Sequence, residues 1–373
     1  NIIDTASGEL IDWENVTASI MTEAAGVKVG IIGLITAHVL QVTIAANAAG
    51  LEIAPLADAI IREATELRAQ GADVVIVTAH AGSYCTEFDD SLDLSSCNLD
   101  GEIVRVANAL PAGLVDHIIA GHVHEAMAHV INGIAVTSSY SNTHAFDRVD
   151  FSIDRATGQI VDRKIFPPQL NCPAFVVATG ECAWLSIDSD AVRPATYEGR
   201  AVVAMPSILK IAAHAKEYAA VIKSEPLGVT IETPFDLDGN PESPLGNLFT
   251  DAVLDSVDAE IAMHNVSGGI RAILPAGELT FGKVFDVMPF DNRVAIIDMS
   301  GAELRRVISA QVVRQGRRVG FSGMRVFVAC DDDVTNVEMI LNNGTVISDD
   351  DRIRIAANDF LATGGDGILT PVI

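Results

Sequence analysis

The sequence predicts an α/β protein whose first half is a mostly parallel sheet covered by helices. Residues 27–35, 72–80 and 115–122 are apolar runs that read as buried strands. Residues 55–71 carry apolar side chains at helical spacing and end on a glycine. Apolar strands that alternate with amphipathic helices are typical of a parallel sheet with helices packed on it.

Two hairpins and a long helix follow this region. The first hairpin turns at Asn132 and Gly133, and the second turns around residues 156–158. Residues 205–225 read as one helix.

From residue 226 the strand and helix patterns start again. Helices are predicted at 245–257 and 301–312, and strands at 259–265, 293–300 and 352–358. A chain of 373 residues exceeds what one hydrophobic core usually supports. We therefore predict a first domain at 1–195, a linker helix region at 196–225 and a second domain at 226–373.

Composition argues against two classes of protein. The chain has 24 basic and 50 acidic residues, a formal net charge of −26. Nucleic-acid grooves are bound through clustered Lys and Arg, so no nucleic-acid partner is expected. The apolar runs are shorter than the roughly 20 residues that a membrane span needs, so no transmembrane helix is expected.

The five cysteines lack the C-x-x-C pairs of a structural zinc site. Cys85 with Cys97, and Cys172 with Cys182, each enclose loop-like sequence. Two short disulfides would suit an oxidising compartment and would leave Cys330 free. The alternative is five reduced thiols in a cytosolic protein.

Histidines follow two of the predicted strands. His80 closes the strand at 72–80, and His122 closes the strand at 115–122. Because parallel strands end at one edge of a sheet, both imidazoles should face one crevice. His124 follows two residues later, in predicted extended geometry on the same side. The pattern indicates a metal site.

Carboxylates are missing from this predicted site. Three neutral imidazoles make an open single-zinc site, whereas two-metal phosphoryl chemistry needs carboxylates to hold two cations. No Asp or Glu ends a recognisable strand in residues 1–155. The site is therefore predicted to be mononuclear or incomplete. Gly82 and Gly121 beside the histidines would let backbone approach a ligand.

Several motifs carry a family resemblance. "AHAG" at 79–82 and "GHVH" at 121–124 resemble the last two metal-ligand motifs of the metallophosphoesterases. Residues 245–253, 267–292 and 358–367 resemble the carboxyl-terminal domain of the 5′-nucleotidase family. The resemblance implies an incomplete metallophosphoesterase-type α/β sandwich, a long linker helix and a second, substrate-binding α/β domain.

The resemblance also implies two divalent metal ions, of Zn, Mn, Mg or Ca. His80 and His122 would bind one ion and His124 the other. The family's remaining ligands and its catalytic histidine lie upstream of the segment that "NIIDTASGEL" resembles. They are expected on an amino-terminal segment absent from this sequence, so no catalytic residue is assigned.

In the second half the resemblance implies a nucleotide site. Phe290 and Phe360 would hold the base between their rings, and Asp366 would accept hydrogen bonds from ribose hydroxyls. Arg271 would meet the phosphate or the substrate's polar face, and Asn292 a base edge. Without the family, the two phenylalanines would read as core. The implied substrate-binding residues are Gly268, Gly269, Arg271, Phe290, Asn292, Phe360 and Asp366.

Two positions depart from the family pattern. Pro241 stands in a stretch that carries a phosphate-binding arginine in many relatives. The family's asparagine before the glycine run corresponds to Val266, with Asn265 one residue away.

The resemblance implies hydrolysis of nucleotide phosphate monoesters by a two-metal-activated water, in a periplasmic or extracellular protein. Two alternatives remain open. One is a hydrolase of the same fold that acts on another ester, such as a thiosulfate-processing enzyme. The other is a nucleotide-binding module without catalysis.

Overall fold

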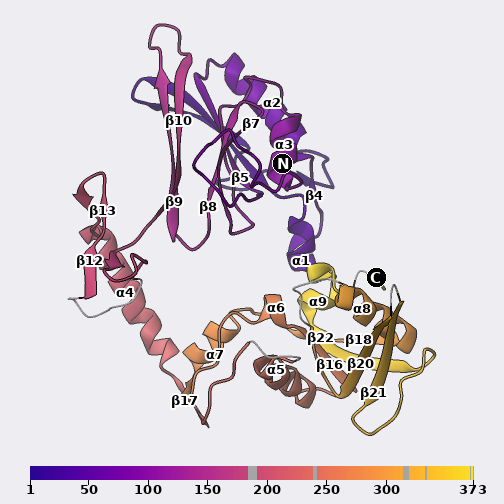
Figure 1. Cartoon of the computed structure of the whole chain (residues 1–373). Coiled ribbons are helices and arrows are strands. Elements are labelled where there is room, and N and C mark those ends of the chain that lie inside the picture. The colour runs from indigo at the N-terminus through magenta and orange to yellow at the C-terminus, as the bar shows by residue number, and fades with distance from the viewer. Residues whose placement is uncertain (184–190, 238–241, 314–318, 332–333, 370, 373) are drawn as a thin grey trace. The chain divides into compact units, whose positions relative to one another are not determined.

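The computed structural model describes residues 1–183, 191–237, 242–313, 319–331, 334–369 and 371–372. They form two compact units (Figure 1). Unit 1 comprises residues 1–40 and 50–204, and unit 2 comprises residues 41–49 and 205–373. The division falls inside the predicted linker region, and the domain boundaries given above stay a prediction.

Among the described residues, six strands form the central sheet of unit 1, in the order β2-β3-β5-β6-β8-β7. The three inner pairs are parallel and the two outer pairs antiparallel, which confirms the predicted mostly parallel sheet. The strands are β2 (Ser19–Ala24), β3 (Val27–Ile35), β5 (Val74–His80), β6 (His117–Ile119), β7 (Ala126–Ile131) and β8 (Ile134–Ser139).

Helices α2 (Leu56–Ala69) and α3 (Glu102–Ala109) pack against this sheet and against each other. The buried residues of α2 recur at helical spacing, from Leu56 to Leu67. A side chain at Gly30 in β3 would come within 2.8 Å of Leu67, so the glycine lets helix and sheet approach closely. The helix predicted at 55–71 is confirmed.

Both predicted hairpins are present. Asn132 and Gly133 join β7 to β8 with φ angles of 49° and 78°, as a two-residue hairpin turn requires. The Asn132 side chain also donates hydrogen bonds to the carbonyls of Ala107 (3.0 Å) and Leu110 (2.9 Å) at the end of α3. The second hairpin pairs β9 (Ala145–Ile153) with β10 (Ile160–Leu170).

The third predicted strand is wrong in its extent. β6 ends at Ile119, so His122 lies in the following loop rather than at the strand's end. The chain turns sharply there because the Val123 N–H donates to the Gly121 carbonyl (3.0 Å). The remaining elements in the described part of unit 1 are β1 (Ile2–Asp4), β4 (Leu51–Ile53), β11 (Ala174–Val176), β12 (Val192–Pro194), β13 (Thr196–Tyr197) and β14 (Arg200–Ala201). The short helix η1 (Val39–Gln41) spans the chain boundary between the two units.

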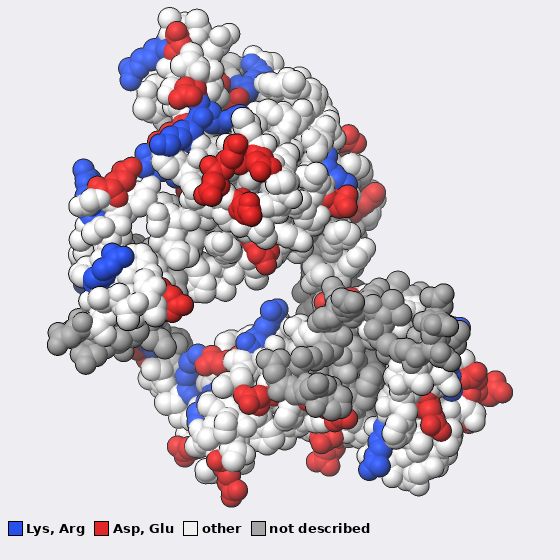
Figure 2. All heavy atoms as spheres, in the orientation of Figure 1, with Lys and Arg blue, Asp and Glu red and all other residues white. Residues whose placement is uncertain are grey.

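Disulfides join Cys85 to Cys97 and Cys172 to Cys182, which confirms the predicted pairs. Cys330 lies in β20, but its side chain is outside the described part of the structure, as is all of Pro241. In the view of Figure 2, acidic side chains gather on the visible face of unit 1, in keeping with the negative net charge.

Unit 2 contains a mixed sheet in the order β18-β22-β16-β19. β16 and β22 are parallel neighbours, and the outer pairs are antiparallel. These strands are β16 (Ile261–Asn265), β18 (Val294–Ser300), β19 (Val319–Ser322) and β22 (Arg352–Asn358). The strands and helices predicted after residue 226 are all found at these places, with helices α5 (Pro244–Asp255) and α8 (Gly301–Val313).

The helix predicted at 205–225 is α4 (Pro206–Lys223), which begins on a proline. Lys223 at its end forms an ion pair with Asp286 (2.5 Å). None of the helices in the described ranges combines the length and apolar character needed to span a membrane. The other elements of unit 2 are α1 (Ala45–Ala48), β15 (Pro226–Ile231), α6 (Val266–Gly269), β17 (Gly277–Thr280), α7 (Phe281–Val287), β20 (Met324–Asp331), β21 (Val334–Leu341), α9 (Asp359–Ala362) and η3 (Gly365–Gly367).

Candidate functional site

His80 and His122 meet at the carboxyl edge of the unit 1 sheet. β5 and β6 are parallel neighbours, with Thr78 opposite Ile119. His122 Nδ1 lies 3.1 Å from His80 Nε2, and the ring centroids are 4.7 Å apart in an edge-on arrangement. In a tetrahedral zinc site with Zn–N of about 2.0 Å, ligand nitrogens lie roughly 3.3 Å apart. The two nitrogens therefore fit a shared cation with little movement.

His124 does not join this pair. The ligand atoms of His80, His122 and His124 do not all lie within 4.8 Å of one another in the described structure. The predicted extended geometry between His122 and His124 is wrong, since their φ angles are 77° and 61°. A non-glycine residue with positive φ is uncommon and costs free energy, so such residues often mark functional sites.

The pKa of His122 is lowered from its ordinary value, mainly because the ring is partly buried. The neighbouring His80 lowers it further, as do His38 and His124, whereas Glu102 raises it. A neutral imidazole is the form that binds metal ions, so these surroundings favour ligation over protonation.

Gly82 allows the two histidine loops to approach each other. A Cβ atom at this position would overlap the Gly121 carbonyl oxygen and lie 2.8 Å from Val123 Cγ2. Gly82 was predicted to let the backbone approach a ligand. In the structure, its missing side chain instead lets two backbone segments approach each other.

We predict that Gly82→Ala destabilises unit 1 by about 2 kcal/mol, because the backbone must move to accept the methyl group. Urea unfolding of the variant and of Gly33→Ala measures this. A side chain at Gly33 meets nothing within 4 Å, so the control should unfold like the native protein. Equal stability of the two variants would contradict the packing argument.

A cavity of about 610 Å³ lies beside His122. Glu102 and His38 line it, and both escaped the sequence analysis. Glu102 accepts hydrogen bonds from Thr36 Oγ1 (2.6 Å) and from the Ala37 N–H (3.0 Å), which fixes the loop that carries His38. Glu102 begins helix α3 rather than ending a strand, so the strand-end pattern does not select it. His38 follows the end of β3, so the rule that found His80 could have found it.

The second candidate site is a cavity of about 400 Å³ in unit 2. Its volume lies in the range of small-molecule sites. All seven predicted substrate-binding residues line it, from positions spread over about one hundred residues of sequence. These residues are Gly268, Gly269, Arg271, Phe290, Asn292, Phe360 and Asp366.

Two asparagines that the sequence analysis left without a role organise this cavity. Asn265 and Asn358 end the parallel strands β16 and β22, and the Asn358 amide donates to Asn265 Oδ1 (3.2 Å). Asn265 in turn donates to Asp366 Oδ2 (2.7 Å). Asp366 has a φ of 56°, so the carboxylate is held in place on a strained backbone. Val266, by contrast, is buried in a hydrophobic cluster.

The two phenylalanines present different surfaces to the cavity. Phe290 is 37% exposed, and the Arg271 guanidinium carbon lies 5.2 Å from its ring centroid. Phe360 is half-buried, and its ring packs so closely on Gly365 that a side chain there would overlap it. Asn292 donates to Asp359 Oδ1 (2.9 Å). An accessible aromatic face beside a cation is suited to a planar, anionic ligand.

His264 lies in the wall of this cavity and is 3% exposed. Burial lowers its pKa to about 4, although the Gly269 backbone opposes the shift. The folded state therefore keeps this ring neutral at pH values at which the unfolded chain is already protonated.

We predict that unit 2 loses stability as the pH falls from 6.5 to about 4, because protons bind the unfolded state more strongly over that interval. The loss from this group is about 3 kcal/mol, and it is complete below the folded pKa. Urea unfolding at pH 7 and pH 4 measures the difference. His264→Gln should flatten this pH dependence, whereas His214→Gln on α4 should retain it. An equally steep dependence in His264→Gln would contradict the prediction.

Comparison with known proteins identifies relatives of the whole chain. Residues 220–372 match the family model described as 5′-nucleotidase, C-terminal domain. The chain is 27% identical to cell wall protein Lmo0130 of Listeria monocytogenes over 92% of its own length and 44% of that protein. It is 25% identical to a 5′-nucleotidase of Vibrio cholerae over 92% of its length and 62% of that protein. The chain thus spans about half the length of these relatives.

A solved structure supports the fold. The crystal structure of a 5′-nucleotidase precursor from Thermus thermophilus aligns with a TM-score of 0.64 and 21% identity, over 95% of this chain and 67% of that one. The predicted fold class is confirmed.

Proposed function

We propose that the complete protein is a 5′-nucleotidase-type enzyme that hydrolyses phosphate monoesters of nucleotides, because residues 220–372 match the C-terminal domain model of that family. The observation that carries the proposal is the convergence of all seven predicted substrate-binding residues on one cavity in unit 2.

The cavity offers a partner for each part of a nucleotide. Phe290 and Phe360 hold the base by stacking, which tolerates different bases. Asp366 accepts hydrogen bonds from ribose hydroxyls and is positioned for this by Asn265. Arg271 binds phosphate through its planar set of donors.

The histidine pair of unit 1 supplies part of a metal site in this proposal. His80 and His122 bind one divalent cation, and His124 binds a second. Divalent cations, when bound, lower the pKa of water and stabilise charge on the phosphate. His80, His122 and His124 alone lack the negative charge that two cations need, so the proposal also requires carboxylate ligands.

The proposed location is periplasmic or extracellular. Two disulfides suit an oxidising compartment, since cytosolic thiols are kept reduced.

Release of phosphate by the full-length protein tests the function. A panel of nucleoside monophosphates, sugar phosphates and thiosulfate should yield phosphate from the nucleotides, and this activity should depend on added divalent metal. Release of sulfate from thiosulfate without phosphate release would favour the hydrolase of another ester. Nucleotide binding without any product would favour the non-catalytic module.

A further inference from the structure

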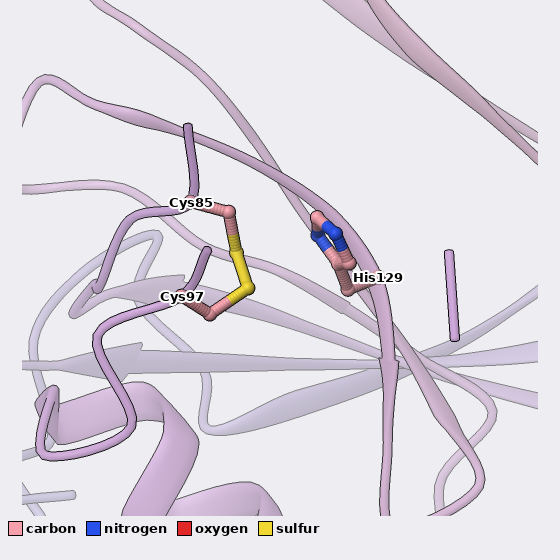
Figure 3. Close-up of side chains that lie close together, drawn as sticks. All are labelled: Cys85, Cys97 and His129. Atoms are coloured by element: carbon pink, nitrogen blue, oxygen red, sulfur yellow. A yellow bond between two sulfur atoms is a disulfide. The ribbon is translucent and has the colours of Figure 1, made fainter. Parts of the chain in front are cut away.

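A buried histidine lies against the Cys85–Cys97 disulfide in unit 1 (Figure 3). A ring nitrogen of His129 and the two sulfur atoms all lie within 4.8 Å of one another. His129 projects from β7, whereas the two cysteines bracket a loop at 86–96. No other trio of potential metal ligands is this compact within the residues that the structure describes.

His129 has unused hydrogen-bonding capacity. The residue is 0% exposed, its Nδ1 accepts a hydrogen bond from the Ala128 N–H (3.3 Å), and its Nε2 has no partner. A buried polar atom without a partner costs about 1–3 kcal/mol. A metal ion would bind the unprotonated nitrogen of the neutral ring, while the other ring nitrogen keeps the proton.

Backbone hydrogen bonds hold the cysteine loop independently of the disulfide. The Cys85 N–H donates to the Ala126 carbonyl (2.9 Å), and the Val130 N–H donates to the Ser91 carbonyl (2.8 Å). Both bonds tie the loop to β7, the strand of His129. We therefore expect the two sulfur atoms to stay beside His129 when the bond between them is broken.

We propose that reduction converts this disulfide into a zinc site, in which Cys85, Cys97 and His129 bind one Zn²⁺. Thiolate and imidazole are the ligands that zinc prefers, and water or a carboxylate takes the fourth position. With Zn–S of about 2.3 Å and Zn–N of about 2.0 Å, neighbouring ligand atoms lie roughly 3.5–3.8 Å apart. Because the three atoms already lie within 4.8 Å of one another, small side-chain rotations suffice.

The conversion requires a dithiol reductant. One thiolate of the dithiol attacks a disulfide sulfur, and its second thiolate completes the exchange. Two electrons and two protons pass to the protein, which then carries two thiols, and the reductant leaves as a cyclic disulfide. Zinc binding displaces the two thiol protons to solvent. Cys97 is less buried than Cys85, so we expect the dithiol to attack at Cys97.

The proposed site also adjoins the cavity beside His122. Tyr84, Thr86 and Asn98 line that cavity and are direct neighbours of the two cysteines in sequence. Exchange of the disulfide for zinc would therefore change a wall of the cavity, whatever reaction takes place there.

Cobalt titration of the full-length protein tests the proposal, in a Cys330→Ser background that removes the fifth cysteine. After reduction and removal of the dithiol, the protein should bind one more Co²⁺ than its oxidised form, with thiolate-to-cobalt absorption that Zn²⁺ abolishes. His129→Asn should weaken this binding roughly tenfold or more. Cys85→Ser/Cys97→Ser should lose the absorption, whereas Cys172→Ser/Cys182→Ser should keep it.

Alkylation provides a second measurement that does not need the variants. Zinc should slow the modification of Cys85 and Cys97 in the reduced protein, and circular dichroism should show a native fold with zinc present. Absence of the absorption in the reduced protein would overturn the proposal, as would its persistence in Cys85→Ser/Cys97→Ser. Unchanged affinity in His129→Asn would do the same. The His80 and His122 site lacks thiolates and gives no thiolate-to-cobalt absorption. The cobalt titration therefore tests the zinc site separately from the proposed nucleotide hydrolysis.

Discussion

His122→Ala is expected to lower kcat/KM for nucleotide hydrolysis by the full-length protein roughly a thousandfold. The reason is that its ring nitrogen lies 3.1 Å from that of His80, where the two would share a cation. Loss of a metal ion removes several kcal/mol of charge stabilisation, and about 4 kcal/mol corresponds to a thousandfold in rate. Phosphate release and metal content, measured on the same samples, check the prediction.

The matched control for this variant is His214→Ala, since His214 is an exposed histidine on α4. It should keep both full activity and full metal content. A His122→Ala protein that retains its metal and its kcat/KM would remove His122 from the metal site. A folded variant that loses metal but hydrolyses nucleotides normally would show that the reaction does not depend on this cation.

Phe290→Ala/Phe360→Ala is expected to raise KM for nucleotides more than a hundredfold. Both rings line the unit 2 cavity, and stacking of a base on an aromatic ring contributes about 1–3 kcal/mol. Each single variant should raise KM about tenfold. The effect on kcat should be small, because the base lies away from the reacting phosphorus. Steady-state kinetics with adenine, guanine and pyrimidine nucleotides measures both constants.

The control for the ring variants is Phe281→Ala. Phe281 is 42% exposed and packs on Phe285 at 6.1 Å between ring centroids, away from the residues that line the cavity. It should leave KM unchanged. An equal rise of KM in Phe281→Ala and in the ring variants would point to a general loss of structure. No rise of KM in the double variant would exclude base stacking at this cavity.

The strand-end rule located part of the first candidate site, the histidine pair of unit 1, from the sequence. Because parallel strands end at a common edge of the sheet, the rule placed His80 at the carboxyl end of β5. The neighbouring strand β6 precedes His122. The same rule applied to β16 and β22 would have selected Asn265 and Asn358, which hold Asp366 in place. The family resemblance supplied the two phenylalanines instead, since an aromatic residue in sequence reads equally well as core.

Local sequence determined the strands, the helices, both hairpin turns and the paired cysteines, because apolar periodicity and turn residues act over a few positions. Tertiary structure alone decided several other contacts between side chains that are distant in sequence. Two such contacts are the hydrogen bonds of Thr36 and Ala37 to Glu102, and the packing of His129 against the Cys85–Cys97 disulfide. The left-handed backbone at His122 was likewise not predicted. Such contacts depend on how strands and loops pack in three dimensions, and no local pattern in the chain encodes that packing.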